Sequence, residues 1–351
     1  MNKFHDSAVC VFTSFTFSYL NRARVLAQSV KKHHPDWKMH AVVTDHAPPD
    51  FTFDLDSEPF DKIVYAEDLE IPSFEQVIFM RNIVEACTAV KGAYFEHLFR
   101  EDWGKVIYLD PDIALFSSID VIADALNEFD IALTPHQIIP EKPTDKRAIM
   151  DNEIGSLKHG TYNLGFLAVR NSDTGKAFAA WWNARLLDFC FDDIPNGLFT
   201  DQRWCDLIPS FFEGVKILRD PGMNVASWNL SHRKLSFEPD GRLLVNGSEL
   251  KFYHFTKLGE VGDTMTQRYA QENLPVYELW NWYKLQVVEN TEDTIPKGWW
   301  HFGVYDDQSK IRDEHRRLYK SRVDLRNTFQ NPYDVTAKLN FKVWLERAGE
   351  F

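Results

Sequence analysis

Short apolar strands alternate with helical segments through much of the chain, and this alternation limits the possible folds more than any other feature of the sequence. Apolar runs at 8–14, 39–45 and 63–66 are typical of buried strands, and an amphipathic helical pattern follows the first of them. Strands that alternate with helices predict a mostly parallel sheet with helices on its faces. We therefore expect an α/β fold, in which ligands bind beyond the carboxyl ends of the strands.

Polar side chains stand at the ends of these apolar runs. Thr13 and Ser14 close the first run, and Asp45 closes the second. Asp110 and Asp112 interrupt a fourth apolar run. Because the carboxyl ends of parallel strands meet at one edge of a sheet, we expect these side chains to share one rim.

The Asp110-Pro111-Asp112 segment is the clearest chemical signal in the sequence. It lies inside the apolar run 106–116, which is expected to be extended, with Pro111 fixing a bend between the two acids. In an extended strand, side chains two positions apart fall on the same side, so both carboxylates can bind one divalent cation. Two carboxylates among apolar residues are costly to bury without such a counter-charge. The motif alone leaves open the alternative of a strand end with two exposed acids.

The composition excludes several functional classes. The 351 residues are 44% hydrophobic and 26% charged, as in ordinary globular proteins with a large core. The formal charge of -13 argues against nucleic-acid binding, which needs a basic surface. No apolar run approaches a membrane span and the first residues do not resemble a signal peptide, so we expect a cytoplasmic protein. The four cysteines lack metal-binding spacing and are expected to be free thiols.

Three other segments carry structural predictions. Residues 79–99 are expected to form one long helix, and the polar, proline-containing stretch 137–159 a mobile loop beside the site. The helical character of the later sequence divides the chain into a main α/β domain, 1–262, and a mainly helical extension, 263–351. In the extension, 310–326 carries seven Lys or Arg against three Asp or Glu. This segment is solvated surface or, alternatively, a surface for an acceptor or for anionic lipid at the membrane periphery.

A set of polar motifs follows in a fixed order along residues 8–260. Its members are Cys87-Thr88-Ala89-Val90-Lys91, Asp110-Pro111-Asp112, Gly160 to Phe166, Thr200-Asp201-Gln202 and Tyr253-His254-Phe255-Thr256-Lys257. In order and spacing these motifs resemble the GT-A-fold glycosyltransferases, closest to the family 8-like type of glycogenin and of bacterial galactosyltransferases in surface-polysaccharide synthesis. The family pattern usually continues His-x-x-Gly-x-x-Lys-Pro-Trp, whereas Phe255-Thr256-Lys257-Leu258-Gly259 follows His254 here. This departure leaves the role of Lys257 open.

The resemblance implies transfer of a sugar from a nucleotide donor, preferably a UDP-sugar, to a glycan or lipid-linked glycan, with retention of anomeric configuration. It also implies Mn²⁺ or Mg²⁺ as the cofactor, because a divalent cation neutralises the charge of the departing diphosphate. The implied metal ligands are Asp110, Asp112 and His254. A histidine among the ligands favours Mn²⁺ over Mg²⁺.

The resemblance assigns further roles by position. The implied nucleotide-binding residues are Thr13, Ser14, Lys91 and Asp110. The implied residues for the sugar or the acceptor are Asn163, Gly165 and Lys257. Asp201 and Gln202 match the pair beneath the donor anomeric carbon, where an acid or amide can stabilise an oxocarbenium-like centre, orient an acceptor hydroxyl or act as a nucleophile.

Each assignment has an ordinary structural alternative. Lys91 is an exposed lysine at a helix end in that interpretation, and His254 is a hydrogen-bonded core histidine. Asp201 is then an acid at a helix N-terminus, and the segment around Asn163 is a plain turn. Arg81 is a weaker candidate for contact with the nucleotide or sugar, and a surface arginine is the favoured interpretation.

Two other functions remain open alongside the transferase. Phosphatases of the haloacid-dehalogenase type also place Asp-x-Asp after a strand, but that signature normally opens the domain and continues with x-Thr or x-Val. In this chain Ile113-Ala114 follows the motif, far from the start. A non-catalytic glycan- or nucleotide-sugar-binding protein on a transferase scaffold is the second alternative. The complete set of polar motifs argues against it.

Overall fold

A seven-stranded sheet forms the centre of the molecule. The structure, a computed structural model, describes residues 8–349. The strand order is β10-β6-β7-β4-β1-β2-β3, and β7 runs antiparallel to its neighbours β4 and β6. The other neighbouring strands are parallel, which confirms the predicted α/β class with a mostly parallel sheet. These strands are β1 Val9–Phe15, β2 Lys38–Val43, β3 Lys62–Tyr65, β4 Lys105–Leu109, β6 Ile131–Leu133, β7 Phe166–Arg170 and β10 Val215–Ile217.

Smaller strand groups lie beside this sheet. β5 and β14 form a two-stranded ribbon, β8 and β9 form another, and β11, β12 and β13 form a three-stranded sheet. Their bounds are β5 Ile113–Leu115, β8 Asp192–Asp193, β9 Leu198–Phe199, β11 Leu235–Phe237, β12 Leu243–Val245, β13 Ser248–Glu249 and β14 Phe252–His254. The β5–β14 ribbon carries residues of the candidate site described below.

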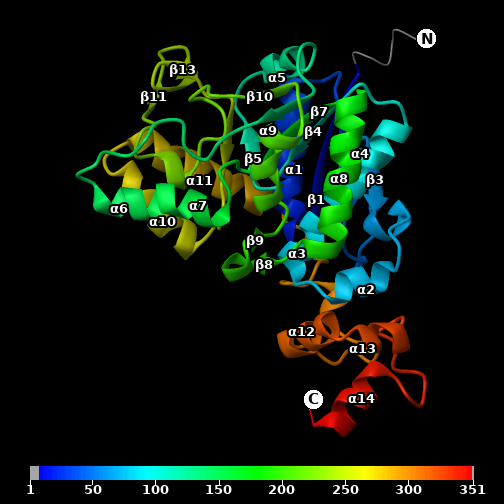
Figure 1. The fold of residues 1–351 in the computed structure, drawn as a ribbon. Helices are drawn as coiled ribbons and strands as arrows, with labels where there is room; N and C mark the ends of the chain where they lie inside the picture. Colours follow the sequence, from blue (N-terminus) through cyan, green and yellow to red (C-terminus); the bar gives the residue numbers. More distant parts are fainter. Residues whose placement is uncertain (1–7, 350–351) are drawn as a thin grey trace.

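Helices cover both faces of the central sheet (Figure 1). α1, Leu20–His33, and α5, Asp120–Ala125, pack on one face. α4, Lys91–Arg100, and α8, Asp173–Phe189, pack on the other. Successive residues of the central strands enter opposite apolar clusters. This is why the strands read as continuous apolar runs in the sequence.

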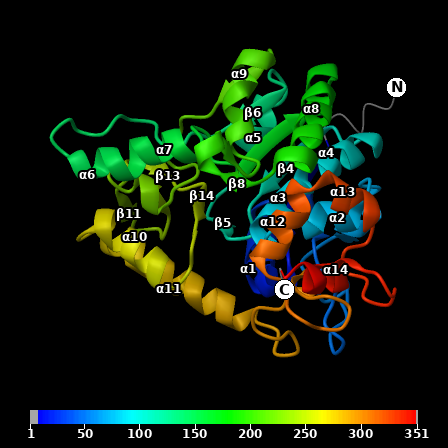
Figure 2. The same ribbon diagram turned by 60° about the horizontal axis from the view of Figure 1, so that its bottom comes forward.

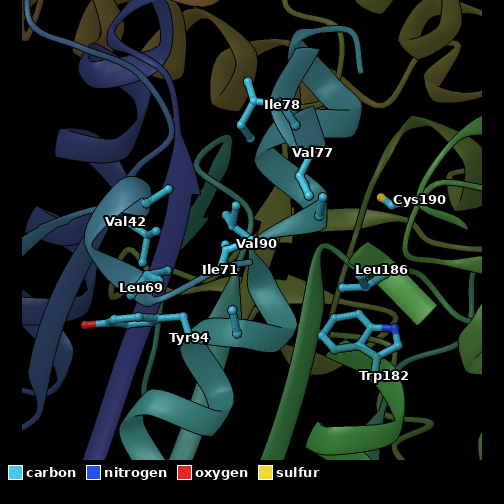
Figure 3. Close-up of a cluster of buried hydrophobic side chains, with 14 of the residues drawn as sticks. Val42, Leu69, Ile71, Val77, Ile78, Val90, Tyr94, Trp182, Leu186 and Cys190 are labelled. Carbon is cyan, nitrogen blue, oxygen red and sulfur yellow. The ribbon is translucent and has the colours of Figure 1, made fainter. Parts of the chain in front are cut away.

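The larger cluster lies between the sheet and the α4–α8 pair (Figure 3). Tyr94 of α4 lies beside the strands, and Trp182 and Leu186 of α8 close the opposite side of the cluster. Gly92 allows the two helices to approach closely, because a Cβ at this position would lie 2.5 Å from the Cα of Asn183. Their contact fixes the start of α4, where Lys91 lies.

Residues 79–99, predicted as one long helix, are divided among α2, α3 and α4, so that prediction is wrong. Asn82 starts α3, because its side chain accepts hydrogen bonds from two backbone N–H groups of the first turn. Thr88 Oγ1 donates to two carbonyl oxygens one turn earlier, a bond that competes with a straight continuation of the helix. α2 spans Phe74–Phe79 and α3 spans Ile83–Ala89.

The stretch 137–159, predicted as a mobile loop, is largely helical. Asp145 starts the helical part by accepting a hydrogen bond from the backbone N–H of Ala148 at 2.9 Å. The two prolines that suggested a loop precede this cap, so they leave the helical backbone intact. The segment consists of α6 Lys146–Ala148, a π-helical turn Ile149–Glu153 and α7 Ile154–His159.

The carboxyl-terminal extension packs at two places (Figures 1 and 2). α10, Glu260–Ala270, and α11, Leu274–Glu289, pack on the β5–β14 ribbon in a third apolar cluster. α12, Asp313–Ser321, and α14, Phe341–Ala348, pack with α2, and α13, Val323–Thr328, lies beside them. The predicted domain boundary after residue 262 falls inside α10, and the division into two domains stays a prediction.

The basic segment 310–326 has one buried arginine, and its other basic side chains are exposed or half-buried. Arg316 is buried, and its guanidinium donates to three backbone carbonyl oxygens. Arg322 forms an ion pair with its neighbour Asp324. Contact with an acceptor or with anionic lipid, the alternative given for this segment, stays a prediction. No helix within residues 8–349 has the length and apolar character needed to cross a membrane. The four cysteines are free thiols, as predicted.

Candidate metal centre and nucleotide rim

The two acids of the Asp-Pro-Asp segment lie on a turn. β4 ends at Leu109, and the N–H of Ile113 donates to the carbonyl oxygen of Asp110 at 3.0 Å. Pro111 takes the second position of this turn, which its fixed φ favours. The segment 106–116 thus consists of β4 and β5, and the bend expected at Pro111 is this turn. The turn brings both carboxylates to the rim of the sheet.

His254 reaches the same place because of strand pairing. β5 begins directly after the turn and pairs antiparallel with β14, with His254 opposite Ile113. The N–H of Phe255 donates to the carbonyl oxygen of Asp112 at 2.8 Å, which extends this pairing. A residue far along the chain thus lies beside the two acids.

The three side chains lie close enough together to hold one cation. His254 Nε2 lies 3.0 Å from Asp112 Oδ1 and 3.7 Å from Asp110 Oδ2. One possible ligand atom from each residue lies within 4.8 Å of the other two. Asn163 Oδ1 lies 3.2 Å from the second ring nitrogen of His254, as expected for a partner that orients a metal-binding imidazole. His254 and Asp112 are buried, and Asp110 is partly exposed.

The charges of this group depend on one another. Burial alone would lower the pKa of His254, but the carboxylates of Asp112 and Asp110 outweigh burial and raise it. Burial alone would raise the pKa of Asp112, but His254 outweighs burial and lowers it. The imidazole and the carboxylate thus stabilise each other's charged form. A buried acid at this position needs a positive partner, which a proton on His254 or a cation can supply.

Lys91 is a buried cation beside the two acids. Its side chain is 2% exposed, and Nζ lies 2.7 Å from Asp201 Oδ2 and 3.3 Å from Asp110 Oδ1. Nζ also lies 4.0 Å from the centroid of the Tyr108 ring. Burial would lower the pKa of Lys91, but Asp110 and Asp201 outweigh it and raise the pKa. The alternative of an exposed lysine at a helix end is therefore wrong.

Asp201 is held in a strained loop. Thr200 has φ 45°, which is rare for a β-branched residue, and its hydroxyl donates to Asp201 Oδ1 at 3.0 Å. Asp201 is 3% exposed, and burial raises its pKa while the Lys91 ammonium opposes that rise. The carboxylate pairs with Lys91, which does not match the alternative of a helix N-terminal acid.

Asn163, Gly165 and Gln202 lie together beneath the acids. A Cβ on Gly165 would lie 2.5 Å from His254 Cε1, so only glycine leaves room for the imidazole. Gln202 Oε1 accepts from the N–H of Leu164 at 2.9 Å, and its Nε2 donates to a backbone carbonyl oxygen. Gln202 therefore supports the turn that carries Asn163 and Gly165. The roles of these residues toward a sugar stay predictions.

The predicted nucleotide-binding residues of the first strand lie on the rim. Ser14 Oγ donates to the carbonyl oxygen of Cys87 at 2.8 Å and lies 3.3 Å from Thr44 Oγ1. Thr13 is fully buried, and within the described chain its hydroxyl has no hydrogen-bond partner. Lys257 differs from these residues, because it is exposed on the loop after β14, with φ 55°.

Three residues that sequence reasoning missed also contact the centre. Tyr108 donates to Asp110 Oδ1 at 2.5 Å. Asn224 Nδ2 donates to Asn163 Oδ1 at 3.0 Å, and the ring centroid of Trp228 lies 5.2 Å from that of His254. The sequence could have identified Tyr108, because it lies two residues before Asp110 and side chains two positions apart in a strand point to the same side. Asn224 and Trp228 lie in a segment without hydrophobic periodicity, so the sequence did not indicate that they contact the centre.

Arg81 is a structural residue in the interior. Its side chain is fully buried, and it donates to the carbonyl oxygens of Val77, Leu186 and Leu187. The expectation of a surface arginine is therefore wrong. Its guanidinium satisfies carbonyl groups at the carboxyl end of α8.

No family model matches the chain. Two relatives from Bacillus subtilis (strain 168), the uncharacterized proteins YfnF and YfnD, are 27% and 24% identical over 180 and 271 residues. The first match covers 50% of this chain and 57% of YfnF, and the second covers 73% of this chain and 78% of YfnD. The matched part thus spans little more than half the length of YfnF.

Solved structures of glycosyltransferases are similar to the chain at low identity. The galactosyltransferase LgtC, in complex with donor and acceptor sugar analogs, is 15% identical with a TM-score of 0.47, and the match covers 83% of this chain and 98% of LgtC. The glycosyltransferase GlyE of Streptococcus pneumoniae TIGR4 is 16% identical with a TM-score of 0.41, with 80% and 64% covered. Mouse xyloside xylosyltransferase 1 is 12% identical with a TM-score of 0.42, with 71% and 98% covered. These TM-scores are below 0.5, so the similarities carry no conclusion about reaction or substrate.

Proposed function

We propose that the chain is a metal-dependent glycosyltransferase that moves a sugar from a nucleotide donor, preferably a UDP-sugar, to a glycan or lipid-linked glycan in the cytoplasm. One observation carries the proposal: Asp110, Asp112 and His254 converge at the rim of a mostly parallel sheet, with ligand atoms within 4.8 Å of one another. The rim of such a sheet is where a nucleotide binds in α/β folds. The buried cation of Lys91 beside these ligands adds a second positive charge for a diphosphate.

The donor set fits a hard divalent cation. Two carboxylates and one imidazole suit Mn²⁺ or Mg²⁺, and the imidazole favours Mn²⁺. Asp110, Asp112 and His254 would hold the ion, and Asn163 would keep the imidazole in place. A cation bound there supplies the Lewis-acid charge that neutralises a departing diphosphate.

The residues around the ligands have complementary roles in this proposal. Lys91 is held by Asp110 and Asp201, so its charge is already positioned when a substrate binds. Asp201 is fixed by Lys91 and Thr200, and its carboxylate can stabilise positive charge on an anomeric carbon. Gln202 holds the turn of Asn163 and Gly165, which would border the donor sugar.

The proposal is tested by the release of UDP from a panel of UDP-sugars in the presence of MnCl₂. We expect Asp112→Asn to lower this activity on the order of 100-fold or more, because it removes a ligand of the Lewis acid. Asp240→Asn, which changes an exposed acid on the β11–β12 turn, is the matched control and should retain activity. Full activity of Asp112→Asn with Mn²⁺ present would overturn the proposal.

Retention of configuration is a separate part of the proposal. Proton NMR of the freshly formed product distinguishes the two outcomes, since donor and product share the anomeric configuration in a retaining transfer. We expect retention, together with a large loss of activity in Asp201→Asn. An inverted product would remove the role given to Asp201 beneath the anomeric carbon.

A further inference from the structure

Asp45, at the end of β2, holds three separate segments together. Its carboxylate is 2% exposed and accepts hydrogen bonds from the backbone N–H groups of Phe17 at 3.3 Å, His46 at 3.0 Å and His301 at 2.7 Å. The first two donors follow β1 and β2, whereas His301 belongs to the carboxyl-terminal extension. A carboxylate at the rim thus ties the extension to the sheet.

The segment 299–302, which we name the strap, makes further contacts at this corner. Trp299 Nε1 donates to the carbonyl oxygen of His46 at 2.8 Å. The rings of His46 and His301 stack, with centroids 4.3 Å apart and planes at 23°. The carbonyl oxygen of Phe302 accepts from the buried guanidinium of Arg316, so α12 holds the other end of the strap. The two imidazole rings and the Trp299 indole thus lie together near Asp45.

This corner is the next part of the rim after the metal centre. In the sheet, β1 separates β4 from β2, so the Asp45 corner lies two strand spacings, about 10 Å, from the end of β4. Between them lie Ser14, Thr44 and Cys87, which are linked by hydrogen bonds of Ser14. Burial and the nearby charges of Asp45 and Asp110 raise the pKa of the Cys87 thiol to about 12.

We propose that the strap forms one wall of the pocket for the nucleotide base, and that its attachment to Asp45 is required for tight nucleotide binding. This inference rests on the proposed function, which places the diphosphate at the cation. An extended nucleoside diphosphate that begins at the Asp110-Asp112-His254 group spans two strand spacings, and its base then reaches the stacked rings of His46 and His301. The extension therefore completes the donor site.

The decisive variant removes one backbone hydrogen bond. His301→Pro lacks the N–H that Asp45 accepts, and proline fits at this position because Trp300 before it is extended and His301 starts a single helical turn. His301→Ala loses the ring and keeps the N–H, so it is the matched control. Binding of UDP, CDP, ADP and GDP to the full chain is measured by calorimetry with MnCl₂, together with binding of Mn²⁺ alone.

We expect His301→Pro to weaken the tightest of these nucleotides about tenfold or more, because the strap loses its backbone hydrogen bond to Asp45. Affinity for Mn²⁺ alone should stay unchanged, and His301→Ala should bind the nucleotide more tightly than His301→Pro. Nucleotide binding by His301→Pro equal to that of the unaltered chain would overturn the inference alone. Failure of the unaltered chain to bind any of the four nucleotides would overturn the proposed function and this inference with it.

A second measurement needs no variant, in case His301→Pro does not fold. Amide hydrogen exchange in the strap is compared for the unaltered chain with MnCl₂ alone and with MnCl₂ and the tightest nucleotide. We expect the nucleotide to slow exchange of residues 299–302, since a base against the strap suppresses its local opening. Exchange that the nucleotide leaves unchanged in the strap, while it slows around Asp110, would overturn the inference.

Discussion

Lys91 connects the two acidic groups of the candidate site. It forms ion pairs with Asp201 and Asp110 from a position that is almost completely buried. Removing one member of a buried ion pair leaves an uncompensated charge, whereas removing both members leaves none. The stability of this cluster therefore depends on the balance of its charges more than on any single contact.

We expect Lys91→Met to lower the free energy of unfolding by about 3–5 kcal/mol, because it leaves the Asp201 carboxylate buried without a partner. Adding Asp201→Asn should recover a large part of this loss. Urea unfolding of the two single variants and the double variant measures the coupling. Strictly additive effects would show that the two charges do not depend on each other.

Gly165 tests the fit of His254 at the centre. A methyl group there would lie 2.5 Å from His254 Cε1 and 2.8 Å from Asn163 Oδ1, so Gly165→Ala must displace the imidazole. We expect Mn²⁺ affinity to fall about 10-fold to 100-fold, the usual effect of disturbing the support of a ligand. Gly155→Ala is the control, since no atom lies within 4 Å of its added methyl group. Titration of both variants with MnCl₂ measures their Mn²⁺ affinity. An unchanged affinity in Gly165→Ala would contradict the proposed role of His254 as a metal ligand.

At the scale of elements, the α4–α8 contact positions both Lys91 and the loop of Asp201. Trp182 Nε1 of α8 donates to the carbonyl oxygen of Asp201 at 3.3 Å, and Gly92 of α4 lies against the backbone of Asn183. The two helices thus act as one support for a charge pair whose members are far apart in the sequence. Gly92 sets the short distance between the two helices.

We expect Gly92→Ala to destabilise the protein by about 1–3 kcal/mol, since the methyl group would lie 2.5 Å from a backbone atom of α8. An exposed helical glycine would show the opposite sign, because alanine has the higher helix propensity by about 1 kcal/mol. Thermal unfolding of Gly92→Ala and Gly155→Ala compares a packed and an open helical position. Equal shifts of the two melting temperatures would argue against close helix packing at Gly92.

The sequence predicted the sheet and the convergence of Asp110, Asp112 and His254 better than the helix boundaries. Apolar runs marked the strands, and the order of motifs brought Asp110, Asp112 and His254 together. The break between α2 and α3 depends on hydrogen bonds of Asn82, and the end of α3 depends on those of Thr88. Hydrophobic periodicity records neither. Local capping by Asp145 also determines where the helical part of residues 137–159 begins. The prolines before it suggest a loop when only the sequence is considered. These helix boundaries depend on single capping side chains. A hydrophobic pattern that extends over a whole helical turn does not reveal them.

At the scale of the whole molecule, isolated polar anchors add to the apolar packing of the carboxyl-terminal extension. Arg316 reaches three carbonyl oxygens and His301 reaches Asp45, from positions that show no motif in the sequence. A helical extension could be predicted from its periodicity, but the place where it meets the sheet could not. The anchors join segments that have no regular spacing in the chain.

Asp45 makes this attachment sensitive to pH. Burial raises the pKa of Asp45 to about 7, despite three backbone donors that lower it. The folded chain therefore keeps a proton that the unfolded chain releases near pH 4, so this group's contribution to stability is lost as the pH rises to about 7. Three pKa units correspond to at most about 4 kcal/mol.

We expect Asp45→Asn to remove this part of the pH dependence. Urea unfolding of the variant and the unaltered chain at pH 5 and pH 8 isolates it, because the other titrating groups are common to both. The free energy of unfolding of the variant, relative to the unaltered chain, should be higher at pH 8 than at pH 5. A difference that does not change with pH would show that Asp45 is ionised throughout.

The proposed glycosyl transfer depends most on a cation bound between two acids and a histidine. Crystals soaked with MnCl₂ and UDP test it directly, through anomalous scattering recorded at the manganese edge. We predict an anomalous peak within coordination distance of Asp110, Asp112 and His254, in contact with the diphosphate oxygens. Density for UDP on the rim without manganese at these three residues, or manganese bound elsewhere, would contradict it.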